Sequence, residues 1–104
     1  MSEGMNKHKG NLKKLAICSS SRARRLIQQS DDDFILAILD AVWTMLAGKV
    51  QLSPAQRKQI KNVQPLLRMF ASRGQSVEER RCVLSTKKGV HAIQTVFNVL
   101  HTHF

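Results

Sequence analysis

The feature that most constrains this chain is a series of local helix signals that divides it into short helices. Three serines each stand three residues before an acid or amide, which is typical of a capping box at a helix start. The three pairs are Ser30 with Asp33, Ser53 with Gln56, and Ser76 with Glu79. Pro54 fits the first helical position, and Gly48 and Gly74 stand where helices should end. The sequence therefore predicts several short helices and no long one.

Apolar spacing between these signals predicts where the helices lie. Residues 31–47 are apolar almost all round, so we expect a central helix there. Residues 54–72 are amphipathic, residues 77–84 suit a short helix, and residues 11–29 suit one or two helices broken near Ser20. The predicted fold class is all-α, a compact bundle of about five or six short helices around the central apolar helix 31–47. The expected organisation is a flexible basic tail over residues 1–10 and a single helical domain over residues 11–104.

The C-terminal stretch leaves two interpretations open. Apolar side chains recur there at steps of three and four, which indicates a helix. They are Val90, Ile93, Phe97, Leu100 and Phe104. Core packing is the favoured role for this face, and a surface for a partner or a membrane is the alternative. Its polar face lacks the Lys and Arg that membrane-surface helices usually carry, which disfavours the membrane alternative, a membrane-active capsid protein, without closing it.

Charge is the strongest compositional signal of function. Lys and Arg number 17 against 7 Asp and Glu, which gives a net charge of +10. The acids are bunched, so long stretches carry positive charge only. Such a chain attracts phosphate polymers, and the predicted partner is nucleic acid, with double-stranded DNA favoured. Only 5% of the residues are aromatic, which argues against base stacking as the main mode of recognition.

The candidate nucleic-acid-binding residues are the clustered cations. Lys and Arg neutralise phosphates and release counterions, so the binding they give is salt-sensitive and largely independent of sequence. The set comprises Lys13, Lys14, Arg22, Arg24, Arg25, Arg57, Lys58, Lys61, Arg68, Arg80, Arg81, Lys87 and Lys88.

Neither catalysis nor a cofactor is expected. The sequence shows no catalytic nucleophile paired with a general base, no Gly-rich phosphate loop and no spacing of metal ligands. We therefore expect no enzymatic activity, no metal, no cofactor and no small-molecule substrate. The acidic run that begins at Asp31 is expected to cap a helix. Cys18 and Cys82 do not form a disulfide framework, and no signal peptide is evident, so an intracellular location is expected.

The order of motifs resembles a family of small basic helical proteins. The matching segments are NLKKLA (11–16), RARRLIQQS (22–30), DDFILAILDAVWTMLAGKVQLSPAQRKQI (32–60), LLRMFASRGQSVEERRCVL (66–84) and TKKGV (86–90). They resemble proteins encoded by Polinton-type and adintovirus-like DNA elements and by related animal DNA viruses. The shared positions are Leu46, Gly48, Val50 and Leu52, then Ser76, Arg80, Arg81 and Leu84, then Gly89. Where the family usually has a double glycine, this chain has Lys88 and Gly89.

The resemblance implies a virion core component that is associated with packaged double-stranded DNA, in the virion or the host nucleus. The main alternative is an interaction module, a capsid-associated scaffold that oligomerises through the apolar faces of residues 31–47 or of the C-terminal helix. A second copy of the chain and a capsid or other viral protein are the partners which that alternative implies.

Overall fold

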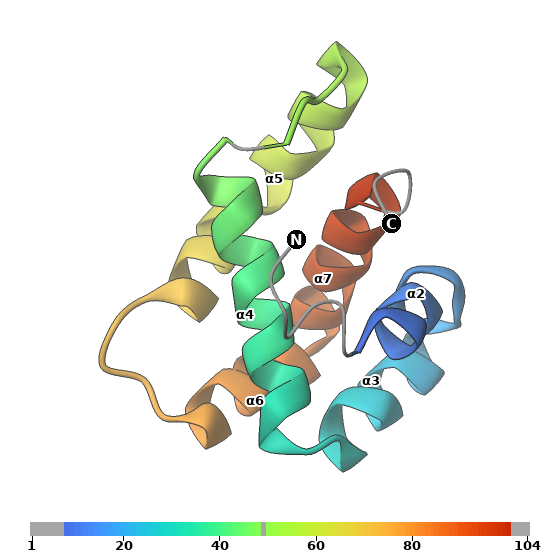
Figure 1. Ribbon diagram of the computed structural model, residues 1–104, viewed down its shortest axis with the longest axis vertical. Helices are drawn as coiled ribbons and strands as arrows, with labels where there is room; N and C mark the ends of the chain where they lie inside the picture. The colour runs from blue at the N-terminus through green and yellow to red at the C-terminus, as the bar shows by residue number, and fades with distance from the viewer. Residues whose placement is uncertain (1–7, 49, 101–104) are drawn as a thin grey trace.

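The computed structural model describes residues 8–48 and 50–100, and this part of the chain is helical with no strand. Its helices are α2 (Lys9–Ile17), α3 (Ser20–Gln29), α4 (Asp32–Leu46), α5 (Pro54–Ala71), α6 (Val77–Ser85) and α7 (Lys87–Leu100) (Figure 1). The Cα radius of gyration is 12.3 Å, close to the value of about 13 Å expected for a compact domain of 100 residues. The predicted all-α bundle is confirmed.

Side-chain caps set the helix starts, mostly where the sequence predicts them. Ser53 and Gln56 form a complete capping box at the start of α5, and Ser76 accepts a hydrogen bond from the backbone N–H of Glu79. The start of α4 differs from the prediction by one residue. Asp31, not Ser30, is the N-cap, because its Oδ1 accepts from the Phe34 N–H at 2.9 Å. Ser30 instead closes α3, and its hydroxyl donates to the Ile27 carbonyl at 2.8 Å.

The glycines that the sequence places at helix ends lie in the left-handed region. Gly48, with φ of 72°, follows α4, and Gly74, with φ of 85°, follows α5. Positive φ costs little for glycine, so the chain reverses direction there without strain. Upstream, the expected break near Ser20 is confirmed, since α2 ends at Ile17 and α3 begins at Ser20 with Ser19 as its N-cap.

Helix α7 occupies the centre of the bundle. It packs against each of the other five helices and lies between α2 and α5 (Figure 1). Its side chains Val90, Ile93, Phe97 and Leu100 are buried, so the core role of this face is confirmed over the described residues. Phe104, assigned to the same face, lies outside them. Gly89 permits the close approach of α6, because a Cβ at this position would lie 2.1 Å from the Val83 carbonyl oxygen.

The centre of the bundle is therefore α7, and not residues 31–47 as the sequence predicted. Helix α4 packs on α5, α6 and α7 along one side, and its opposite side faces solvent. Leu36 is 43% exposed and Trp43 is 46% exposed on that outer side. Apolar composition all round suggested enclosure, but among the described helices the neighbours of α4 lie along one of its sides.

The predicted N-terminal tail ends earlier than expected. Helix α2 begins at Lys9, so residues 9 and 10, assigned to the tail, are helical. Residues 1–7 of the expected tail lie outside the described residues. In the part of the chain that the structure describes, no helix is long and apolar enough to cross a membrane.

Candidate nucleic-acid interface

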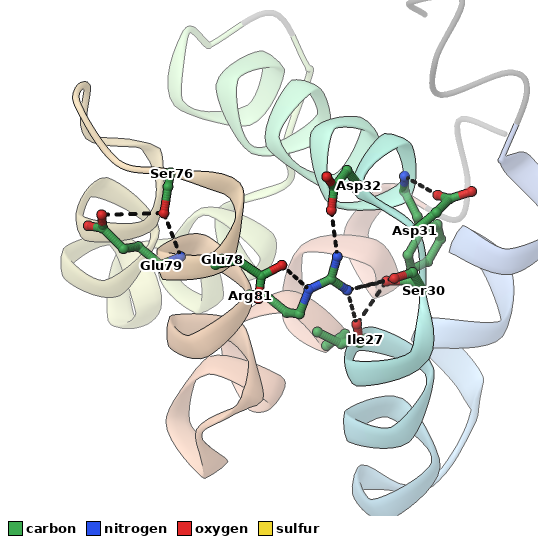
Figure 2. A network of polar contacts seen from close by, with 9 residues as sticks. Ile27, Ser30, Asp31, Asp32, Ser76, Glu78, Glu79 and Arg81 are labelled. Atoms are coloured by element: carbon green, nitrogen blue, oxygen red, sulfur yellow. Dashed lines mark hydrogen bonds and ion pairs between the residues drawn. The ribbon is translucent and has the colours of Figure 1, made fainter.

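Two of the predicted phosphate-binding cations hold the fold together instead. Arg81, on α6, is only 13% exposed and lies between the end of α3 and the start of α4 (Figure 2). Its Nη1 donates to the Ile27 and Ser30 carbonyl oxygens at 2.8 and 2.7 Å. Its Nη2 contacts Asp32 Oδ1 at 3.0 Å, and its Nε lies 3.5 Å from Glu78 Oε1. One guanidinium thus supplies donors to the unpaired carbonyls at the end of α3 and joins α3, α4 and α6.

Arg80 does the same at the end of α5. It is 8% exposed, and its guanidinium donates to the Phe70 carbonyl and, at 3.0 Å, to the Ser72 carbonyl. Its Cζ also lies 5.9 Å from the centroid of the Phe70 ring, within the range of a cation–π contact. Because the donors of Arg80 and Arg81 are used within the fold, we leave both residues out of the candidate interface. These are the two adjacent cations of the motif that carries the family resemblance.

The other predicted cations remain at the surface. All are exposed except Lys13, which is half-buried. Within residues 8–48 and 50–100, none of them has a side-chain hydrogen bond or ion pair. The carboxylates of the described chain are confined to α4, α6 and the cap at Asp31, so α2, α3, α5 and α7 carry no acid. All of these cations except Lys13 and Arg24 fall into three groups, and each group lies on its own part of the bundle.

The first group lines a groove between α2 and α3, which we call the α2–α3 groove. Its cations are Lys14, Arg22 and Arg25, and the volume of the groove is about 580 Å³. Arg22 and Arg25 lie about one turn apart on α3, so both side chains reach the same side of the helix. The apolar side chains of Ile17 and Leu26 also line it, a contribution that was not predicted from the sequence. Arg24 lies on another face of α3, because two residues correspond to about 200° of rotation.

The second group forms a stripe along α5, which we call the α5 stripe. Arg57, Lys61 and Arg68 are at positions i, i+4 and i+11, so they lie on one face, and Lys58 lies beside them. The distance along the helix axis from Arg57 to Arg68 is about 16 Å at 1.5 Å per residue. The opposite face of α5 is buried in the core, which fixes the direction of the stripe toward solvent.

The third group is Lys87 and Lys88 at the start of α7. They line a groove of about 780 Å³ with Pro65, Leu66 and Met69 of α5. We call it the α5–α7 groove. Positive side chains in the first turn of a helix oppose its dipole and destabilise it by about 0.3–1 kcal/mol each. The first turn of α7 has no acid to offset them.

No protein-family model, no curated protein and no solved structure matches this chain. The surfaces described above and the family resemblance of its motifs are therefore the features of the chain that indicate its function.

Proposed function

We propose that this protein is a non-enzymatic, largely sequence-independent DNA-binding and DNA-condensing protein, and that it serves as a component of a virion core. The observation that supports the binding role is the state of the surface cations. They are exposed, they are free of ion pairs within the described residues, and four of the helices carry no carboxylate. Cations without intramolecular partners are available to neutralise phosphates, and the counterions condensed on those phosphates are then released. The virion role comes from the family resemblance.

Condensation needs more than one binding surface on each molecule. Helix α7 lies between α2 and α5 (Figure 1), so the cations of the α2–α3 groove and those of the α5 stripe belong to helices on different sides of α7. The longest extent of the molecule is only 34 Å, so two duplexes bound at these surfaces would lie close together. A monomer with this arrangement can bridge two duplex segments and neutralise both.

Independence of sequence follows from the chemistry of the surfaces. Isolated Lys and Arg side chains contact phosphates, which carry no sequence information, whereas base reading needs a set of side chains inserted into a groove of the DNA. Among the described residues no Phe, Tyr or Trp lines the α2–α3 groove or the α5–α7 groove, and His91 is the one ring side chain, in the α5–α7 groove. We therefore expect similar affinity for unrelated duplexes, and weaker stacking-dependent binding to single strands.

The first experiment measures binding to random-sequence duplex DNA over a salt series, with single-stranded RNA alongside. We expect log K to fall linearly with log salt, with a slope of about −0.9 for each phosphate contacted. Arg25→Gln should reduce the slope by about 0.9, and Arg73→Gln should leave it unchanged, because Arg73 is exposed but outside all three groups. Absence of binding at low salt would overturn the proposal.

The second experiment tests bridging with two duplexes that carry different fluorophores. The groove variant neutralises Lys14, Arg22 and Arg25 with Gln, and the stripe variant neutralises Arg57, Lys61 and Arg68 with Gln. Each variant should still bind one duplex through its remaining surface, and each should lose energy transfer between duplexes. Bridging by both variants would contradict the two-surface arrangement, because either surface would then be sufficient.

A further inference from the structure

The outer side of α4 is the one exposed surface of the described chain that combines apolar and acidic character. Leu36 and Trp43 are two of the four large hydrophobic residues that are exposed within residues 8–48 and 50–100, and they lie seven residues apart on one face. Asp33 and Asp40 are exposed on the same side of the helix. Helix α4 contains no Lys or Arg. We call this surface the α4 stripe.

The α5–α7 groove has the complementary character. Leu66, Pro65 and Met69 supply apolar walls, and Met69, 50% exposed, is another of the four exposed large hydrophobics. Lys87, Lys88 and His91 line the α7 side, and none of the described carboxylates lines the groove. Charge and hydrophobicity therefore match those of the α4 stripe, with acid facing base and apolar facing apolar.

The two surfaces also match in length. Leu36 to Trp43 is seven residue steps, about 10 Å along the helix axis, and the α5 wall of the groove runs the same seven steps from Asn62 to Met69. Helices dock into grooves through anchors spaced by three, four and seven residues, which is the spacing of the α4 stripe. No residue of α4 lines the groove, so a molecule does not fill its own groove with its own stripe.

We propose that the α4 stripe of one copy docks in the α5–α7 groove of a second copy. The interface is heterologous, because each copy contributes a different surface and keeps the other surface free. Such contacts build open chains when the rotation between copies does not close a ring. The α2–α3 groove and the α5 stripe are not part of the contact. The contact does use Lys87 and Lys88, the third group of the candidate nucleic-acid interface, so it is tested on the protein alone, in the absence of nucleic acid.

Association should be weak, because the contact is small and the net charge of +10 opposes it. Interfaces below about 1,200 Å² are typical of weak and transient encounters. We expect half-association at roughly 10–100 μM, in buffer of about 0.15 M salt that screens the long-range repulsion.

The experiment uses the full chain, purified free of nucleic acid, and measures its mass by sedimentation over a range of concentrations. Trp43 is the only tryptophan, so its emission reports docking directly. The expected result is a mass that grows with concentration, together with a shift of the Trp43 emission to shorter wavelength as the ring leaves water. A chain that stays monomeric up to about 500 μM overturns the proposal, because a contact that weak would be outside the expected affinity range.

A complementation test identifies the two surfaces. Leu36→Glu disables the stripe, and Met69→Glu disables the groove, while both substitutions are at exposed positions and leave the fold intact by circular dichroism. Each variant alone should be monomeric. An equimolar mixture should form a one-to-one dimer and nothing larger, because the intact stripe of the Met69→Glu variant binds the intact groove of the Leu36→Glu variant and no second pair of intact surfaces remains.

The control is Ile17→Glu, which introduces the same charge at an exposed apolar side chain of α2. It should associate like the unmodified chain. A monomeric mixture of the two disabled variants, or undiminished association by either one alone, would show that the stripe and the groove are not each other's partners.

Discussion

Arg22 is at a position where helix stability and DNA binding should favour different side chains. It is the third residue of α3, and its backbone N–H donates to the Ser19 hydroxyl at 3.3 Å. In α5 the equivalent third residue, Gln56, accepts from the Ser53 N–H at 3.0 Å and completes a capping box. The two N-caps have nearly the same backbone conformation, with φ, ψ of −66°, 160° at Ser19 and −68°, 161° at Ser53. Arg22→Gln should therefore complete a second capping box.

The gain in stability can be estimated from the contacts. The new hydrogen bond is exposed and contributes about 0.5 kcal/mol, near the lower end of the usual range. Removal of a positive charge from the first turn of α3 adds about 0.3–0.5 kcal/mol, since the helix dipole disfavours cations there. Arg and Gln have similar helix propensities, so the total is about 1 kcal/mol, and Tm should rise by about 4–8 °C.

The same substitution should weaken DNA binding. Arg22 lines the α2–α3 groove, so its loss removes one phosphate contact and reduces the slope of log K against log salt by about 0.9. Thermal unfolding and the salt series of binding are measured on the same preparation. An unchanged or lower Tm would refute the cap reasoning, and an unchanged slope would refute the place of Arg22 in the interface.

Two controls separate charge from capping. Arg24→Gln removes the same charge from α3 at a position with no cap geometry, so its stability should stay within about 0.5 kcal/mol of the unmodified chain. Arg22→Lys keeps the charge and lacks the carbonyl oxygen of Gln, so it should retain the salt slope and gain no stability.

Three further substitutions test the fold by urea unfolding. Arg81→Gln should lower the free energy of unfolding by about 3 kcal/mol, because the carbonyls at the end of α3 lose a charged donor, and a loss below about 0.5 kcal/mol would contradict its structural role. Gln94→Leu should cost about 1–2 kcal/mol, because the Gln94 amide donates to the Leu15 and Cys18 carbonyls at the end of α2, and a neutral result would show that water replaces it. Gly89→Ala should cost about 3 kcal/mol, because its Cβ would overlap the α6 backbone, whereas Gly10→Ala, with open space at its Cβ, should be tolerated.

Local signals explain why so much of the helix pattern could be predicted. The starts at Ser53 and Ser76 and the reversals at Gly48 and Gly74 depend on hydrogen bonds and backbone angles within a few residues. Such signals act within one helical turn, so helix ends can be recognised from a single amino-acid sequence. The error at Ser30 is a displacement of one residue. Ser30 and Asp31 could each cap a helix, and in the structure Ser30 is the C-cap of α3 and Asp31 is the N-cap of α4.

The candidate interface was predicted less completely, because side chains of one type have different roles in the fold. Arg80 and Arg81 carry the same charge as Arg24 and Arg25, and nothing in their composition separates them. Exposure separates them in the structure, since Arg80 is buried and Arg24 and Arg25 are exposed. The α2–α3 groove also includes Ile17, whose neighbours across the groove belong to a different helix.

The sequence by itself determined the all-α class, most helix boundaries and the excess of positive charge, because these depend on composition and on neighbours within a turn. Tertiary structure decided which helix is central and which cations are free. Arg81 donates to carbonyl oxygens that are 51 and 54 residues away in the sequence, and Gln94 donates to one that is 79 residues away. Periodicity indicates which face of a helix is apolar, but not which helix covers that face. Helix α7 therefore occupies the centre, and α4 has one side left open to solvent.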